Sequence, residues 1–202
     1  MVKIDKDPII VHIMRIFKRQ GFNDFILASG YKGQVIKKYF KKNKEFKVKV
    51  IDTGLKSLTG TSLKKLKKYL INEDQFVVTY GDGVANINLN NLINFHLNHK
   101  KEATMTVVRP PVRFGEVKMR NGTITNFEEK PQIKNNWING GFFIFNKNIF
   151  KYFSKNNEML EKKPIQKMTK AKKIMGFQHK GFWQCMDTQR DKKYLQSLIK
   201  QN

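Results

Sequence analysis

The chain has 202 residues, with 40 Lys and Arg against 16 Asp and Glu, which gives a formal net charge of +24. A hydrophobic fraction of 40% and an aromatic fraction of 12% allow a packed core and exclude a disordered basic tail. The single cysteine excludes a disulfide scaffold, and no apolar run reaches the roughly 18 residues of a membrane span. The N-terminal residues contain no long apolar stretch, so we expect no signal peptide. We expect a soluble, cytoplasmic protein with one domain over residues 1–202.

The excess of positive charge is compatible with a polyanionic partner, such as nucleic acid, anionic lipid or a phosphorylated substrate. The lysines occur in scattered pairs, without interleaved aromatic side chains that could stack on bases. Such pairs usually form a solvated face. We therefore expect no specific nucleic-acid partner and no membrane partner.

Apolar runs and their periodicity predict that strands and helices alternate over the first half of the chain. Asp7 as N-cap and Pro8 in the first turn predict a helix that continues to Gly21. Strands are predicted at 25–28, 47–51, 76–80 and 103–108, and helices at 34–42, 63–70 and 90–100. This alternation is typical of an α/β fold with a three-layer, mostly parallel sheet.

The pattern changes after residue 109. Asn121-Gly122 between short strands at 116–119 and 123–127 predicts a β-hairpin. A buried strand at 142–145, two short helices, a strand at 174–178 and a helix from about residue 191 follow. The second half of the sheet is therefore predicted to lean antiparallel.

Gly81-Asp82-Gly83 directly follows a predicted buried strand. In an open α/β sheet, ligands bind beyond the carboxyl ends of the strands, and an Asp there can hold a hard cation beside phosphates. An ordinary turn, in which Asp caps nearby amides, explains the same residues equally well. The motif alone leaves both interpretations open.

Three other segments carry polar groups next to predicted strands. Glu129 and Lys130 end the hairpin, where Lys130 could neutralise a phosphate and Glu129 could accept from hydroxyls, although a solvated turn is the simpler interpretation. Asn139-Gly140-Gly141 indicates a close backbone approach or a bulge. Trp183 could form a pocket wall and Asp187 a second acidic group, unless Asp187 merely begins the last helix.

In this order, the segments resemble the sugar-1-phosphate nucleotidylyltransferases, and within them the glucose-1-phosphate cytidylyltransferases. The resemblance covers essentially the whole chain, and it rests on the following motifs: Pro8-Ile9-Ile10-Val11-His12-Ile13-Met14, Gly30-Tyr31-Lys32-Gly33, Asp52-Thr53-Gly54 with Leu58-Thr59-Gly60, Thr79-Tyr80-Gly81-Asp82-Gly83-Val84, Pro110-Pro111-Val112-Arg113-Phe114-Gly115, Glu129-Lys130-Pro131, Trp137-Ile138-Asn139-Gly140-Gly141-Phe142-Phe143 and Gly181-Phe182-Trp183-Gln184-Cys185-Met186-Asp187-Thr188.

The resemblance implies a Rossmann-like nucleotide-diphospho-sugar transferase fold and a Mg²⁺-dependent condensation of CTP with glucose 1-phosphate to CDP-glucose and pyrophosphate. It implies that Asp82 and Asp187 hold Mg²⁺ and that Lys130 contacts the sugar phosphate, the three forming the catalytic set. It further implies a homo-oligomer and the following substrate-binding residues: Gly81, Gly115, Glu129, Asn139, Gly140 and Trp183.

Two departures qualify what the resemblance implies. Family members open with a strand and a Gly-Gly-x-Gly-Thr-Arg loop that grips the triphosphate, and this sequence begins after the corresponding Lys-Pro. We therefore expect that the first strand is absent, that the sheet has an unpaired edge and that turnover is impaired. Ser62 stands where cytidylyltransferases carry an arginine, which puts nucleotide contacts in doubt. A thymidylyl-, uridylyl- or guanylyltransferase and a non-catalytic paralogue that binds sugar phosphate or regulates a relative remain alternatives.

Overall fold

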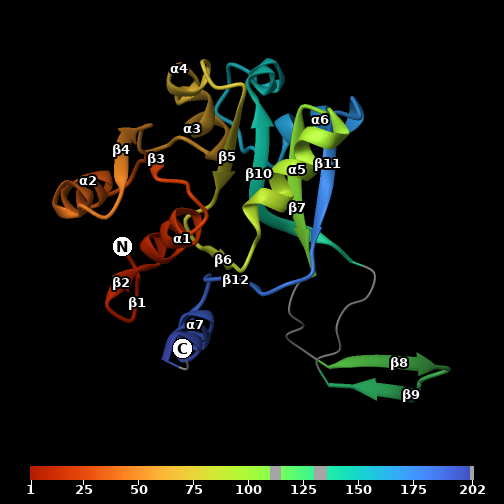
Figure 1. Cartoon of the computed structure of the whole chain (residues 1–202). Coiled ribbons are helices and arrows are strands. Elements are labelled where there is room, and N and C mark those ends of the chain that lie inside the picture. Colours follow the sequence, from red (N-terminus) through yellow and green to blue (C-terminus); the bar gives the residue numbers. More distant parts are fainter. Residues whose placement is uncertain (110–114, 130–135, 201–202) are drawn as a thin grey trace.

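The computed structural model describes residues 1–109, 115–129 and 136–200, and its largest sheet is four-stranded and mixed (Figure 1). The strand order is β11-β7-β10-β5, formed by Ile174–His179, Ala103–Val108, Ile138–Asn146 and Gln75–Thr79. β11 and β7 are parallel, whereas β10 is antiparallel to both β7 and β5. The predicted α/β class with an antiparallel-leaning second half is therefore confirmed. The prediction of a mostly parallel sheet is wrong for this sheet, because β10 runs antiparallel between β7 and β5 and, of its described strands, only β11 and β7 pair in parallel.

Two further strands, β3 (Asp24–Ser29) and β4 (Lys47–Asp52), form a separate parallel pair. Within the described ranges, β3 pairs with β4 alone and β5 with β10 alone, so each keeps an edge without a strand partner. Side chains of α1 (Ile9–Lys18) join the two sheets. The Phe17 ring stacks on Phe142 of β10, with 6.2 Å between ring centroids, and meets Phe25 of β3 edge-on at 6.2 Å.

The other helices are α2 (Gly33–Lys42), α3 (Thr59–Lys65), α4 (Lys67–Leu70), α5 (Leu89–His99), the 3₁₀ helix η1 (Lys147–Tyr152), α6 (Lys163–Lys170) and α7 (Gln189–Lys200). The helix predicted at 63–70 begins earlier, at Thr59, and is interrupted at Leu66. The predicted N-cap role of Asp7 is wrong. Asp7 belongs to a short strand, β2 (Asp7–Pro8), which pairs with β1 (Lys3–Ile4), and its carboxylate accepts from Arg15 at 2.6 Å.

β10 lies at the centre of the core because its alternate side chains enter two different clusters. Phe142 and Ile144 pack with residues of α1 and α5, whereas Phe143 and Phe145 pack against η1 and α6. All four side chains are at most 1% exposed. The strict alternation of a strand therefore fixes one layer of helices on each face of the sheet.

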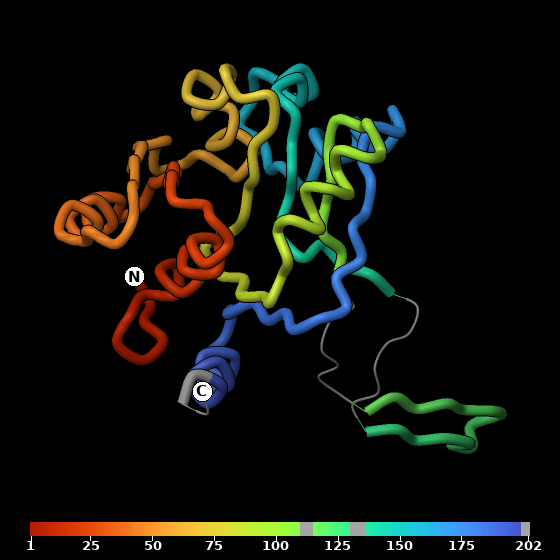
Figure 2. Tube along the Cα trace, in the orientation of Figure 1, coloured from red at the N-terminus to blue at the C-terminus, as the bar shows by residue number. Residues whose placement is uncertain are grey.

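The predicted hairpin is present as β8 (Glu116–Arg120) and β9 (Thr123–Glu128). Asn121 and Gly122 have φ values of 49° and 81°, as a two-residue hairpin turn requires. The hairpin extends away from the four-stranded sheet (Figure 2), and every residue in its two strands is exposed.

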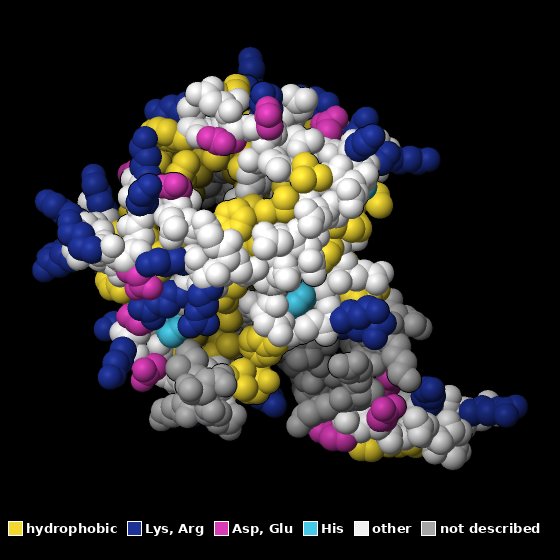
Figure 3. All heavy atoms as spheres, viewed as in Figure 1, with side chains coloured by type: hydrophobic (Ala, Val, Ile, Leu, Met, Phe, Trp, Pro, Cys, Tyr) yellow, Lys and Arg dark blue, Asp and Glu magenta, His cyan; other side chains and the backbone are white. Residues whose placement is uncertain are grey.

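The surface carries Lys and Arg side chains that are spread over the visible face, with Asp and Glu between them (Figure 3). This distribution agrees with a solvated basic surface. The described helices include no apolar segment of the length that a membrane-spanning helix needs.

Candidate active site

A short antiparallel ladder brings the two predicted acidic residues together. β6 (Gly83–Ala85) pairs with β12 (Trp183–Cys185), and Gly83 lies opposite Cys185. Asp82 immediately precedes β6, and Asp187 follows β12 by two residues. The Met186 backbone N–H donates to the Asp82 carbonyl at 3.0 Å, which extends the pairing to the residue beside Asp187. Segments about one hundred positions apart therefore meet at one end of the ladder.

The electrostatics of this pair reflect the proximity of its two charges. Partial burial raises the pKa of the Asp82 carboxyl, and the negative charge of Asp187 raises it further. The Cys185 thiol donates to Asp187 Oδ2 at 2.8 Å. Burial, this hydrogen bond and the nearby carboxylates raise the pKa of Cys185 to about 12, so the thiol stays protonated and is a poor nucleophile.

Asp191 holds the turn that carries Asp187. Its Oδ2 accepts from the backbone N–H groups of Asp187 at 3.2 Å and Thr188 at 2.9 Å, and its Oδ1 accepts from Gln184 Nε2 at 3.2 Å. Thr188 Oγ1 in turn accepts from the Asp191 N–H at 3.2 Å. Sequence reasoning missed Asp191, although Thr188-x-x-Asp191 has the spacing of a helix capping box.

Two other predicted residues, Trp183 and Gly140, lie in direct contact beside the acid pair. Trp183 Nε1 donates to the Gly140 carbonyl at 2.8 Å, which joins β12 to the first part of β10. Gly140 is buried, and a Cβ there would lie 2.8 Å from Val108 Cγ1 and 3.1 Å from the Thr106 carbonyl oxygen. The close approach predicted at this glycine is therefore that of β7, and a bulge in β10 accompanies it.

Asn139 and Gly81 lie at the adjoining strand ends. Asn139 Oδ1 accepts from the Gly141 N–H at 2.9 Å, and its Nδ2 donates to the Tyr80 hydroxyl at 3.4 Å. Gly81 is exposed, and nothing lies within 4 Å of the position that a Cβ would take there. Backbone at Gly81 is therefore open to a ligand.

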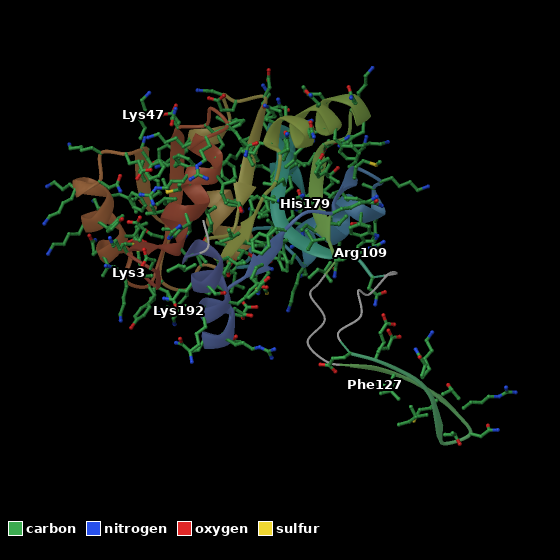
Figure 4. The ribbon with its side chains drawn as sticks, turned by 60° about the horizontal axis from the view of Figure 1, so that its bottom comes forward. Lys3, Lys47, Arg109, Phe127, His179 and Lys192 are labelled. Carbon is green, nitrogen blue, oxygen red and sulfur yellow. The ribbon has the colours of Figure 1, made fainter. Side chains whose placement is uncertain are left out.

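The remaining predicted residues belong to the hairpin. Gly115 and Glu129 lie together at its open end, since a Cβ on Gly115 would lie 3.1 Å from Glu129 Oε2 and 2.6 Å from the Phe127 ring. Figure 4 shows Phe127 well away from the sheet, whereas Arg109 lies at the end of β7. The structure thus does not bring Gly115 and Glu129 to the acid pair. Lys130 lies outside the described residues.

The donor set at Asp82 and Asp187 fits a magnesium ion that also binds a phosphate ligand. Among the described residues, no group of three or more His, Cys, Asp or Glu side chains could hold a metal ion by itself. Mg²⁺ is commonly held by one or two carboxylates together with substrate phosphates and water. The partly buried Asp82 carboxyl, with the negative charge of Asp187 nearby, matches that requirement.

The histidines have structural partners. His96 Nδ1 and His99 Nε2 both hydrogen bond with the Thr104 hydroxyl, at 2.8 and 2.7 Å. His12 Nε2 and His179 Nε2 each lie 3.0 Å from a backbone carbonyl oxygen. Their rings therefore connect elements of the fold.

Comparison with known proteins identifies the family. The family model described as nucleotidyl transferase matches residues 1–193. The chain is 38% identical to the glucose-1-phosphate cytidylyltransferase of Salmonella typhimurium, over 98% of this chain and 86% of that protein. It is 35% identical to the probable glucose-1-phosphate cytidylyltransferase of Bacillus subtilis, over 93% of this chain and 82% of that protein.

Solved structures share the fold. HddC from Yersinia pseudotuberculosis matches with a TM-score of 0.77 and 22% identity, over 98% of this chain and 88% of that chain. UDP-glucose pyrophosphorylase in complex with UDP-glucose matches with a TM-score of 0.73 and 16% identity, over 100% and 89% of the two chains. The predicted Rossmann-like nucleotidyltransferase fold is confirmed. The chain belongs to the nucleotidyl transferase family, and it is an enzyme of the sugar-1-phosphate nucleotidyltransferase class.

Proposed function

We propose that the chain condenses CTP with glucose 1-phosphate to CDP-glucose and pyrophosphate. The 38% identity to a glucose-1-phosphate cytidylyltransferase along 98% of the chain supports this choice of substrates. The meeting of Asp82 and Asp187 at the end of the β6/β12 ladder supports a site for a metal-bound triphosphate. This meeting is the observation that carries the proposal, because isolated sequence motifs do not require it.

The reaction exchanges one phosphorus–oxygen bond for another. An anionic phosphate oxygen of glucose 1-phosphate forms a bond to the α-phosphorus of CTP. The bond from that phosphorus to the oxygen bridging to the β-phosphate breaks, and pyrophosphate leaves with its electron pair. The attacking oxygen carries no proton, so no general base is needed. Catalysis then depends on orientation and on neutralisation of phosphate charge.

The proposed roles follow from these needs. Asp82 and Asp187 would hold Mg²⁺, which supplies positive charge to the phosphates when it is bound. Asp191 keeps Asp187 in place through the backbone contacts of the turn. Lys130 would contact the sugar phosphate. The sugar-binding roles of Gly115, Glu129, Asn139 and Gly140 remain predictions from the family resemblance, as does the pocket wall at Trp183.

The test is pyrophosphate release from CTP and glucose 1-phosphate with Mg²⁺ present, in wild type and in Asp82→Asn and Asp187→Asn. Each substitution should lower kcat about 100-fold or more, because a charge-stabilising group at the reacting phosphates is lost. Asp24→Asn, a control at an exposed carboxylate in β3, should leave kcat unchanged. UTP, dTTP and GTP in place of CTP test the choice of nucleotide.

Three outcomes contradict the proposal in different ways. Full activity of both Asp variants would show that Asp82 and Asp187 do not contribute to catalysis. Faster turnover with another nucleotide would move the chain to a different transferase within the same class. Tight binding of both substrates without any turnover by wild type would favour a non-catalytic paralogue. Slow turnover by wild type, by contrast, would agree with the proposal and with the impairment expected from the sequence.

A further inference from the structure

A polar network next to the acid pair contains a carboxylate that the reaction above does not use. Glu161 lies in the turn before α6, and its two oxygens have different partners. The Tyr80 hydroxyl donates to Oε1, and the Thr59 hydroxyl donates to Oε2 at 2.8 Å. One side chain thus connects the end of β5 to the start of α3.

The network continues from Tyr80 into the proposed sugar pocket. Asn139 Nδ2 donates to the Tyr80 hydroxyl at 3.4 Å, while Asn139 Oδ1 accepts from the Gly141 N–H at 2.9 Å. Tyr80 also occupies the space beside Gly141, where a Cβ would lie 2.8 Å from Tyr80 Cδ2. The Tyr80 ring therefore packs against the strand at Gly141, and its hydroxyl provides a second anchor for the Asn139 amide beside the Gly141 N–H.

The direction of the Tyr80 hydroxyl depends on Glu161. A phenol can donate one hydrogen bond, and here the Glu161 carboxylate accepts it. The lone pairs of the Tyr80 hydroxyl oxygen are then available to accept from the Asn139 amide. The Asn139 amide then has one N–H and one oxygen lone pair left for a ligand hydroxyl. Without Glu161, the Tyr80 proton is free to turn toward Asn139 Nδ2, which opposes the hydrogen bond that Nδ2 donates and leaves the amide held by the Gly141 N–H alone.

We propose that Glu161 is a positioning residue for sugar-phosphate binding, which acts through Tyr80 on Asn139. This inference rests on the proposed function, since it takes a sugar phosphate as the ligand beside Asn139. Glu161 also holds Thr59, so a purely structural role is the competing explanation for any effect of its removal. The experiment must therefore separate the branch toward Asn139 from the branch toward Thr59.

Isothermal titration calorimetry with glucose 1-phosphate and, separately, with CTP provides that separation without requiring turnover. Glu161→Gln and Tyr80→Phe should each raise the Kd for glucose 1-phosphate roughly tenfold, which is the usual effect of losing a hydrogen bond that involves a charged group. The Kd for CTP should change less than about twofold in Tyr80→Phe. Thr59→Val removes the other branch together with the hydrogen bond that Thr59 Oγ1 accepts from the Leu160 N–H at 2.9 Å, and it should lower Tm while leaving the Kd for glucose 1-phosphate unchanged.

The double variant Glu161→Gln/Tyr80→Phe adds a second, independent test. Because both residues act along one path, the double variant should bind glucose 1-phosphate no more weakly than Glu161→Gln alone. Glu73→Gln removes an exposed carboxylate near β5 and serves as the matched charge control. Thermal unfolding of every variant reports whether it is folded, and Tyr80→Phe keeps the ring in place if Glu161→Gln does not fold.

The outcomes distinguish this inference from the function on which it rests. If wild type binds glucose 1-phosphate and the Tyr80→Phe and Glu161→Gln variants bind it equally well, the positioning role is refuted and the proposed function stands. Equal losses of glucose 1-phosphate and CTP binding, or an equal loss in Thr59→Val, assign Glu161 a structural role instead. A wild type that binds no glucose 1-phosphate refutes the proposed function and this inference together.

Discussion

Arg15 should be a principal polar attachment between α1 and the separate β3/β4 pair. Its Nε and Nη2 atoms donate to the two carboxylate oxygens of Glu45, at 2.8 and 2.9 Å, and its Nη1 donates to Asp7 at 2.6 Å. Glu45 lies in the loop that leads into β4. Arg15→Met removes all three hydrogen bonds and keeps most of the apolar stem, so it isolates the polar part of the contact.

The expected loss follows from the geometry and the exposure of the three side chains. Arg15, Asp7 and Glu45 are 33%, 32% and 29% exposed, so solvent screens their charges substantially. Exposed ion pairs contribute about 0.2–1 kcal/mol each, and the bidentate contact with Glu45 belongs at the upper end. We expect Arg15→Met to lower the free energy of unfolding by about 1–2 kcal/mol and Tm by about 3–6 °C for a chain of this size.

The pH dependence provides a more specific test. The hydrogen bonds from Arg15 lower the pKa of Glu45 in the folded state. The stabilisation is therefore complete above the unfolded-state pKa of about 4.3 and is lost as the pH falls through the lower folded-state value. Urea unfolding at about pH 7 and about pH 3 should show a smaller difference between wild type and Arg15→Met in acid. Arg19→Met replaces an exposed arginine directly after α1 and serves as the control, so it should leave the free energy of unfolding unchanged. Equal Tm values for the two variants, or a difference that persists in acid, would refute the reasoning.

Two further substitutions test contacts elsewhere in the fold. Gly60→Ala should destabilise by about 1–3 kcal/mol in thermal unfolding, the opposite of the usual sign in a helix, because its Cβ would lie 2.9 Å from both the Glu158 carbonyl oxygen and the Leu160 nitrogen. A Gly60→Ala variant more stable than wild type would contradict this. Burial lowers the pKa of His96, so folding favours the neutral ring, and stability falls as the pH drops below the unfolded-state value of about 6.5. His96→Gln should make that fall shallower in urea unfolding between about pH 7 and pH 5, and parallel curves for the two proteins would count against it.

The parts of the fold that the sequence predicts are those with a local signal. The core of the strand at Ile138–Asn146 follows from a continuous apolar run, Phe142 to Phe145, because a strand covered on both faces needs apolar side chains at successive positions. The strand at Ala103–Val108 follows instead from its β-branched residues, which include the buried Thr104 and Thr106. The hairpin turn follows from Asn121-Gly122, since few other residue pairs adopt two consecutive positive φ values. In these cases the cause of the structure lies within a few residues of sequence.

The parts that were missed depend on contacts between distant segments. β6 and β12 have three residues each, and neither has an apolar alternation long enough to be recognised. They form strands because they pair with each other. Asp7 is a second example. Its neighbours in sequence predict a helix N-cap, but in the fold its carboxylate accepts a hydrogen bond from Arg15. The proximity of Asp82 and Asp187 was therefore available only from the family resemblance.

The acid pair also explains why the surrounding turn contains so many backbone hydrogen bonds. Burial first, and the nearby charge of Asp187 second, raise the pKa of Asp82, so keeping this carboxyl ionised opposes folding. The pairing of Met186 with Asp82 and the Asp191 contacts to Asp187 and Thr188 oppose that effect by fixing the backbone on both sides. Asp191 is buried and already occupied by these donors, so it supports the turn, whereas Asp82 and Asp187 are the two carboxylates of the metal site proposed above. In that proposal, a bound divalent cation would neutralise the acid pair and the phosphates together, as charge neutralisation at the α-phosphorus requires.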